Sequence, residues 1–349
     1  MSEQNTLGVA TVAAAPAPHR DPLAVIVRFQ SLIGLILVVI GGIIFSPRRH
    51  GAILFLAPDN IANIVRAVSE TGIIAVGMTF VIITAGIDLS VGAVLGLSAV
   101  VTATMMIWGG FGLVATLLAV LLMGTLFGLI QGAISSRFRL EPFIVTLAGL
   151  QAARGLALVV SGNQYINISY GDGAGLAPPI FAVLGQRLFD NTVPVATIVF
   201  VVFAGLATFV LNTTRFGRYV FAVGGNERAA RISGIPVSTV KIAVYAITGF
   251  ASALAGIVHA GQFNFGSAND GAGYELTAIA AVVIGGTSLF GGSGSMVGTV
   301  AGTIMLGALA NILQLNNITP AMQLLATAAI IVLAAVLQSL VRRREGLGR

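Results

Sequence analysis

The chain has 349 residues, of which 56% are hydrophobic and only 9% are charged, whereas soluble domains carry about a quarter charged residues. Several apolar runs approach the roughly 20 residues that cross the hydrocarbon core of a bilayer, which excludes an ordinary soluble protein. The runs are continuous rather than alternating in short segments, which excludes a transmembrane barrel. The predicted fold class is therefore all-α, a polytopic bundle of transmembrane helices.

Charge and cysteine content narrow the functional classes further. The formal net charge is +6, but the basic residues lie between the apolar runs instead of in one dense patch. We therefore expect topology signals and no nucleic-acid partner. The chain contains no cysteine, which removes disulfides, thiolate catalysis and cysteine metal sites.

The predicted order along the chain is a polar tail, a membrane domain and a basic tail. Residues 1–23 are rich in alanine and proline and lack the basic-then-apolar order of a signal peptide, so we expect a disordered cytoplasmic tail. Residues 24–341 form the membrane domain and 342–349 a basic cytoplasmic tail. About ten spans are predicted, at 29–46, 61–84, 90–108, 111–135, 142–161, 193–212, 241–262, 274–290, 295–315 and 320–341.

The distribution of basic residues predicts the orientation. Ten crossings place both termini on one side, where the segments carry Arg137, Arg139, Arg215, Arg218, Arg228, Arg231, Lys241, Arg342, Arg343, Arg344 and Arg349. The loops at 162–192, 263–273 and 316–319 contain Arg187 as their single basic residue. Both termini are therefore predicted to be cytoplasmic, and Arg48 and Arg49 are a discordant pair on the outside.

Two segments do not read as ordinary spans. "VIITAGIDLSVGAVLGL" (81–97) places Asp88 and Ser90 among glycines, and "VVIGGTSLFGGSGSMVG" (282–298) surrounds Thr287 and Ser288 with glycines. Irregular backbone at membrane depth persists where it is buried in protein or lines a wet cavity, so both segments predict interior breaks or short re-entrant turns. Their similarity hints at a duplicated half.

Asp88 has two alternative roles. An ionisable residue within a span is a functional candidate that faces the bundle interior or water. Alternatively, its carboxylate caps the helix that begins near Ser90, and the sequence favours this role; a cap at a bend of the path would combine both.

Two further pairs of polar residues interrupt apolar spans. Gln151 and Arg154 lie three residues apart and share a helix face. Arg154 can bind a substrate, extend toward the interface or pair with a buried carboxylate such as Glu275, and we expect the pair. Arg66 lies four residues before Glu70, the spacing of a salt bridge within one helix.

A capped helix is predicted in the longest cytoplasmic loop, about 213–240. In "NERAARISGIPVSTVK" (226–241), Asn226 is a good N-cap and Glu227 suits the positive first turn. Gly234 then ends the helix, because glycine readily adopts a left-handed conformation.

This loop helix offers small and apolar contact area between basic residues. Its contact residues are Ala229, Ala230, Ile232 and Ile235, flanked by Arg228 and Arg231. A helix lying on anionic lipid is one alternative. Alanine is a poor lipid anchor and the segment lacks an aromatic residue, which favours docking against a soluble partner.

Four stretches carry a family resemblance. "GRYVFAVGGNERAARISGIPVSTVKIAVYAITGFASALAGI", "YELTAIAAVVIGGTSLFGGSGSMVGTVAG", "AVGMTFVIITAGIDLSVGAVLGLSA" and "EPFIVTLAGLQAARGLALVVSG" resemble the permease subunit of ribose-type ABC sugar importers, in order, over about residues 24–341. The resemblance implies that the helix from Asn226 to Ile235 couples to a cytoplasmic ATP-binding subunit. It also implies two permease copies, an external sugar-binding protein, ATP-Mg bound by the partner subunit, and the inner membrane of a bacterium.

The expected translocation path runs between two permease copies. Its candidate residues are Asp88, Ser90, Gln151, Arg154, Asn163, Asn264, Glu275, Thr287 and Ser288. Asn163 and Asn264 begin polar loops that suit a passing sugar or a docked binding protein, although any solvated loop is polar.

Two other functions compete with this prediction. An ABC permease for branched-chain amino acids or nucleosides has the same general architecture. A secondary transporter driven by an ion gradient would use a carboxylate near the membrane midplane, and Asp88 is the candidate.

Catalysis has little support in the sequence. His19, His50 and His259 are far apart and have no metal-ligand spacing. A GxxxxGK[ST] phosphate loop is absent from the sequence, so this chain is predicted to be a non-catalytic subunit.

Overall fold

The structure is a computed structural model that describes residues 30–329, 332 and 336. The two predicted tails, the end of the tenth predicted span and Arg342, Arg343, Arg344 and Arg349 lie outside the described residues.

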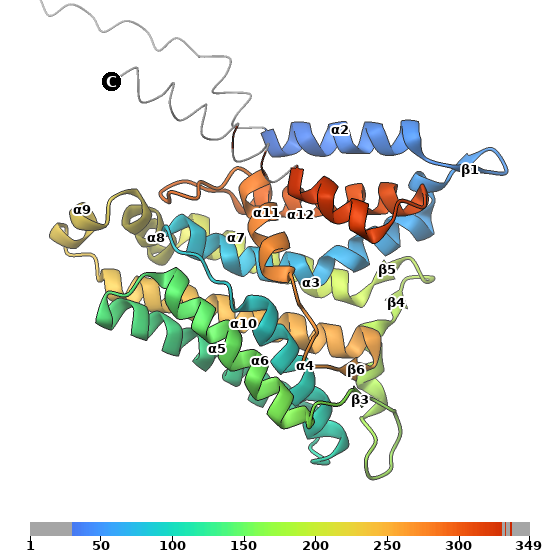
Figure 1. The fold of residues 1–349 in the computed structure, drawn as a ribbon, viewed down its shortest axis with the longest axis horizontal. Helices are drawn as coiled ribbons and strands as arrows, with labels where there is room; N and C mark the ends of the chain where they lie inside the picture. Colours follow the sequence, from blue (N-terminus) through green and yellow to red (C-terminus); the bar gives the residue numbers. More distant parts are fainter. Residues whose placement is uncertain (1–29, 330–331, 333–335, 337–349) are drawn as a thin grey trace, which may run out of the picture.

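Long antiparallel helices make up the described part of the chain (Figure 1). They are α2 (Gln30–Phe45), α3 (Pro58–Ile83), α4 (Val91–Ile107), α5 (Leu113–Phe138), α6 (Pro142–Ser161), α7 (Val195–Thr213), α10 (Val237–Phe263), α11 (Tyr274–Ile284) and α12 (Met296–Leu315). Residues 320–329 are also helical. A helix therefore lies in each of the ten predicted spans, which confirms the all-α class.

The helices differ in their ability to cross a membrane alone. Within the described residues, 6 are long and apolar enough by length and composition, namely α3, α5, α6, α7, α10 and α12. The helices α2, α4 and α11 are apolar but shorter. Short helices α8 (Arg215–Gly225) and α9 (Glu227–Ile232) lie between α7 and α10, and 3-10 turns cover Leu54–Leu56 and Pro179–Gly185.

The bundle has two distinct ends. Three antiparallel strand pairs gather at one, which we call the hairpin end, opposite α8 and α9 at the α9 end (Figure 1). The pairs are β1 (Arg48–Arg49) with β2 (Ala52–Ile53), β3 (Ile166–Asn167) with β6 (Phe265–Gly266), and β4 (Arg187–Leu188) with β5 (Val193–Pro194). Their registers pair Arg48 with Ile53, Ile166 with Gly266, and Arg187 with Pro194.

The core forms where small residues bring backbones together. On α5, Gly124, Gly128 and Gly132 are spaced one helical turn apart and face α10. A β-carbon at Gly128 would overlap the carbonyl of Tyr245. Because lipid supplies no hydrophobic drive for helix association, such close contacts carry the packing energy instead.

Both predicted breaks are present, and they touch. The chain leaves helical geometry between α3 and α4 and again between α11 and α12. The amide of Gly292 donates to the carbonyl of Ile83 at 2.9 Å. Gly224, near the end of α8, packs against the same carbonyl so closely that a β-carbon would overlap it.

The prediction of an outer loop at residues 263–273 is wrong. Residues 263–273 do not stay at the hairpin end but run back into the bundle along α4, where Gly266 lies against Ala99 and Gly271 against Gly92. The sequence indicated a solvated loop because this stretch is polar. As a result α11 has 11 residues, and the span predicted at 274–290 is a shorter helix that starts inside the bundle.

The contact between α5 and α10 gives a test of packing. We expect Gly128→Val to destabilise the protein by about 1 to 3 kcal/mol through overpacking. Gly155→Val is the matched control, because Gly155 on α6 has open space where its β-carbon would lie. The readout is the melting temperature of detergent-purified protein, and equal melting temperatures for the two variants would contradict the packing shown.

Candidate functional site

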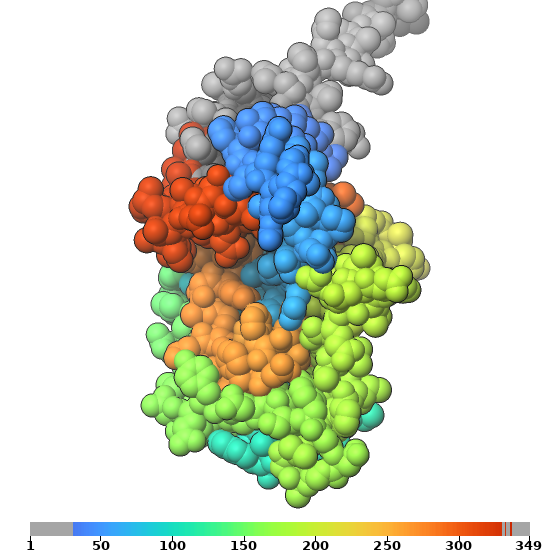
Figure 2. Space-filling view, turned by 90° about the vertical axis from the view of Figure 1, so that its right-hand side faces the viewer, coloured from blue at the N-terminus to red at the C-terminus, as the bar shows by residue number. Residues whose placement is uncertain are grey.

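A cavity of about 1050 Å³ opens into the bundle between α3, α10, α11, α12 and residues 320–327. It lies on the side of the molecule where Figure 2 shows α12 in red beside α3 in blue and the end of α10 in orange. Amides and hydroxyls supply much of its lining, among them Asn63, Thr71, Thr303, Gln314 and Gln323.

The cavity follows the first half of α3 and stops where that helix enters the packed core. The stretch of α3 from Asn60 to Thr71 lines it and rises roughly 16 Å at about 1.5 Å per residue. Beyond Thr71, every residue from Gly72 to Ile83 is buried in the bundle core. The cavity is therefore a half-channel that leads inward from the hairpin end and stops at packed side chains.

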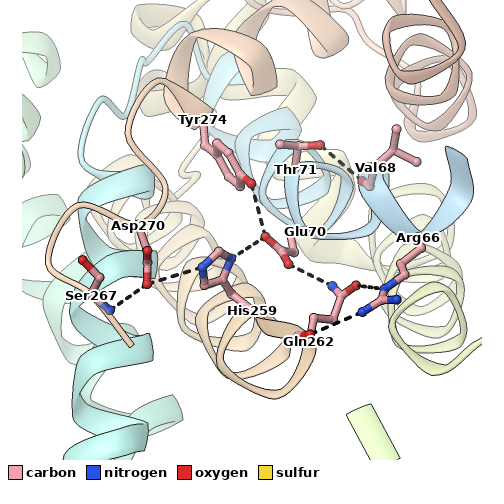
Figure 3. A network of polar contacts seen from close by, with 9 residues as sticks. All are labelled: Arg66, Val68, Glu70, Thr71, His259, Gln262, Ser267, Asp270 and Tyr274. Atoms are coloured by element: carbon pink, nitrogen blue, oxygen red, sulfur yellow. Dashed lines mark hydrogen bonds and ion pairs between the residues drawn. The ribbon is translucent and has the colours of Figure 1, made fainter. Parts of the chain in front are cut away.

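Glu70 is the centre of a buried polar network on the cavity wall (Figure 3). Its carboxylate accepts from Gln262 Nε2 at 2.8 Å and from the Tyr274 hydroxyl at 3.3 Å. His259 Nδ1 lies 2.8 Å from Glu70 Oε2. Three helices, α3, α10 and α11, therefore meet at one carboxylate.

His259 joins this carboxylate to a second one. Its Nε2 lies 3.3 Å from Asp270 Oδ2, within ion-pair distance but without the geometry of a hydrogen bond. Asp270 in turn accepts from the backbone amide of Ser267 at 2.7 Å. The network thereby ties the re-entrant segment after α10 to α3.

Arg66 takes a partner that the sequence did not indicate. Its Nε donates to Gln262 Oε1 at 2.8 Å and its Nη2 to the Gln262 carbonyl at 3.3 Å. The expected Arg66–Glu70 salt bridge is therefore wrong, because the Gln262 amide stands between the two charged groups and satisfies both. The cation and the carboxylate on the cavity wall are each hydrogen-bonded before any ligand arrives.

Two asparagines in the cavity lining join α3 to α12. Asn60 and Asn311 exchange two hydrogen bonds, at 2.9 and 2.8 Å, and so link α3 to α12. From β4, Arg187 donates to Asn63 at 2.7 Å and lies 3.1 Å from Asp59. Arg187, the single basic residue of the loops predicted at 162–192, 263–273 and 316–319, thus contacts the first turns of α3.

Asp88 lies away from the cavity. It is 1% exposed, and its Oδ1 accepts from the Ser90 amide at 2.9 Å and the Ser90 hydroxyl at 2.6 Å. Gln131 Nε2 extends the chain of contacts by donating to Ser90 at 2.9 Å. The predicted bond between Asp88 and a backbone N–H at the break is therefore present, but the N-cap residue of α4 is Ser90, without a side-chain cap bond.

Arg154 binds backbone rather than a carboxylate side chain. Its Nη1 donates to the carbonyls of Ala268 and Asp270 in the re-entrant segment. The ion pair expected with Glu275 is not among the contacts of the described residues. The Glu275 carboxylate lies against α4 instead, where a β-carbon at Gly92 would touch its Oε2. Arg154 binds these carbonyls because backbone that has left helical geometry needs a hydrogen-bond donor.

The other predicted path residues also lie outside the cavity lining. Gln151 and Asn163 are exposed, and the Asn264 side chain accepts from the Tyr170 hydroxyl at 2.5 Å. Thr287 and Ser288 lie in the second break, near the α9 end. The sequence missed His259, whose isolation in an apolar span was the available signal, and the Asn60–Asn311 pair.

The α9 helix has the predicted caps. Asn226 Oδ1 accepts from the Ala229 amide at 2.9 Å, and Gly234 ends the helix with a φ of +81°. Glu227 lies 2.6 Å from Lys241 and 3.0 Å from Arg231. The hydrogen bond from Lys241 holds the pKa of Glu227 below its ordinary value.

The contact face of α9 differs from the one predicted. Ala230 is 5% exposed and Ile235 is half-buried, so both anchor the helix to the bundle. Ile232 is 81% exposed and stands on the outer face with Arg228 and Arg231. The sequence marked the apolar residues correctly but could not tell the inward face of so short a helix from the outward one.

Most of the chain is similar in sequence to known proteins. Residues 60–335 match the family model described as "Branched-chain amino acid transport system / permease component". The chain is 41% identical to the ribose import permease protein of Haemophilus influenzae, over 81% of this chain and 85% of that protein. It is 39% identical to the ribose import permease protein of Escherichia coli K12, with 89% and 93% covered.

A more distant relative is the xylose transport system permease protein of Escherichia coli K12. The two are 33% identical, with 93% of each chain covered. No solved structure matches this one.

The network around Glu70 predicts a strong effect on stability. We expect Glu70→Ala to destabilise the protein by about 3 to 5 kcal/mol, because removal of one member of a buried pair leaves the others unpaired. Thr71→Ala is the control, since the Thr71 hydroxyl bonds locally to the Val68 carbonyl. Thermal unfolding in detergent measures both variants, and a Glu70→Ala protein as stable as Thr71→Ala would refute the network.

Proposed function

This chain belongs to the family of permease components described for the branched-chain amino acid transport system, and from that premise we propose that it is the membrane subunit of an ABC importer for a monosaccharide. The relatives named for ribose and xylose support a sugar as the cargo over an amino acid.

The character of the cavity is the observation that carries this proposal. An amino acid has an ammonium and a carboxylate, each of which would need an available opposite charge when desolvated. In the described part of the lining the charged side chains are Arg66 and Glu70, and Gln262 already binds both. The other polar groups of the described lining are neutral amides and hydroxyls, and such groups suit the hydroxyl groups of a sugar.

The orientation and the partners complete the proposal. We place the α9 end and both termini in the cytoplasm and the hairpin end outside, in the inner membrane of a bacterium. A separate subunit that binds ATP-Mg docks on α9, and an external binding protein delivers the sugar to the half-channel. Two copies of the 24–341 permease domain form the path, and nucleotide-driven closure of the ATP-binding subunits moves α9. The weak, dispersed contacts of the lining leave selectivity to the binding protein.

A gradient-driven carrier finds less support in this chain. That mechanism needs a carboxylate that exchanges an ion with the path, and Asp88 is buried against Ser90, outside the described cavity lining. Glu70 lines the cavity, but its oxygens already face three partners.

Docking at α9 can be tested with one exposed side chain. We expect Ile232→Asp to reduce recovery of an ATP-binding subunit with the tagged chain at least about tenfold, because a buried charge in an apolar contact costs more than about 1.4 kcal/mol. Ile180→Asp, the same substitution at a residue that is 65% exposed at the hairpin end, should have no effect. Unchanged recovery with Ile232→Asp would reject α9 as the docking element.

The half-channel can be tested by filling it. Ala310 is exposed and lines the cavity, so Ala310→Trp should block it and lower uptake of labelled ribose or xylose about tenfold or more while leaving the ATP-binding subunit attached. Ala152→Trp, on an exposed position of α6, is the size-matched control. Uptake is measured in cells that lack the native permease, with labelled leucine alongside. Wild-type sugar uptake by Ala310→Trp would exclude this cavity as the path, and leucine uptake would exclude the sugar.

A further inference from the structure

A second pocket of about 380 Å³ lies between α5, α7 and α10 and reaches the end of α3. Aromatic and aliphatic side chains form its walls, including Phe80, Phe203, Leu206, Val210 and Phe250. The one hydroxyl in the lining, that of Thr125, donates to the Leu121 carbonyl at 2.7 Å. The pocket lining therefore presents no free polar group, which suits an apolar ligand. None of its lining residues belongs to the cavity beside Glu70.

The pocket occupies the depth of one leaflet. On α7, Phe203 and Val210 stand ten and three residues before the helix end at Thr213. At about 1.5 Å per residue these positions lie roughly 15 and 5 Å from the α9 end of that helix. Half of the hydrocarbon core is about 15 Å thick, so an acyl chain of the leaflet on the α9 side reaches along the whole pocket.

Basic and interfacial side chains follow directly after the α7 wall of this pocket. The Thr214 hydroxyl donates to the carbonyl of Val210, a pocket wall, at 2.6 Å, and Arg215 follows directly. The ring of Phe216 packs on that of Phe80 with centroids 6.3 Å apart. One turn on, Arg218 donates to the Thr213 carbonyl at 3.5 Å.

These cations have no anionic partner in the described chain. Arg215 and Arg218 are exposed and are absent from the ion pairs of the described residues. Tyr219 beside them is 36% exposed, and tyrosine is enriched at membrane interfaces. Basic pockets between helices on the cytoplasmic side are suited to anionic lipid headgroups.

We propose that the pocket between α5, α7 and α10 holds an acyl chain of an anionic phospholipid of the cytoplasmic leaflet, and that Arg215 and Arg218 bind its phosphate. The assignment of the leaflet rests on the proposed orientation, whereas the site itself does not depend on the cargo. α9 begins beyond the far end of α8, so the lipid and a subunit docked on α9 occupy different ends of that helix. The bound lipid braces α8 where it leaves the membrane.

Native mass spectrometry of the purified full chain tests the headgroup site. The protein is incubated with phosphatidylglycerol or phosphatidylcholine of identical acyl chains, and retained lipids are counted. Two guanidinium contacts should favour phosphatidylglycerol by about tenfold or more. Arg215→Gln with Arg218→Gln should abolish that preference, while Arg48→Gln with Arg49→Gln removes the same charge at the hairpin end and should preserve it.

Filling the pocket tests the acyl-chain site. Ala246 contributes to the pocket wall, so Ala246→Phe should reduce retention of both lipids, with thermal unfolding as the check on folding. No preference in the wild-type protein, or equal preference in the two arginine double variants, would overturn the proposal. Because the assay involves neither sugar nor ATP, these results are independent of the cargo and of docking at α9.

Discussion

Backbone that leaves helical geometry inside a bilayer must find hydrogen-bond partners in protein, and this constraint explains several of the polar residues in the spans. In the first break, the carbonyl of Ile87 accepts from Thr146 at 3.2 Å and lies 3.4 Å from the Tyr245 hydroxyl. Arg154 does the same for the re-entrant segment by donating to the carbonyls of Ala268 and Asp270. Ionisable and hydroxyl groups that look like substrate contacts in the sequence therefore hold the broken backbone in place.

The same constraint places the breaks beside the proposed coupling element. Ile83 at the end of α3, Gly292 in the second break and Gly224 near the end of α8 meet at one carbonyl. Glycine is required at Gly292 because its φ is +77°, and at Gly224 because a side chain would overlap the carbonyl. The proposed coupling motion of α9 would therefore reach both breaks through α8, without passing through the lipid-facing helices.

Local patterns in the sequence predicted the features that depend on neighbouring residues. The spans follow from apolar runs, and the caps of α9 follow from Asn226 and Gly234, because these contacts involve residues a few positions apart. The Glu70–His259 contact joins residues 189 positions apart, and no spacing rule connects them. Polarity alone also misplaced residues 263–273, since a polar segment satisfied by Arg154 and His259 reads the same as a solvated loop.

The distribution of charge separates support from transport in this bundle. Glu70, His259 and Asp270 bind one another, and Arg66 is bound by Gln262, so the strongest electrostatic groups near the cavity are engaged in joining α3, α10 and the re-entrant segment. The rest of the polar lining consists of neutral amides and hydroxyls, several of which also bond within the bundle, as Asn60 and Asn311 do with each other. A path of this kind binds weakly at several positions, which favours passage over retention. Tight binding at the cavity wall would require the network to open, and opening it would also release the segment that leads into α11.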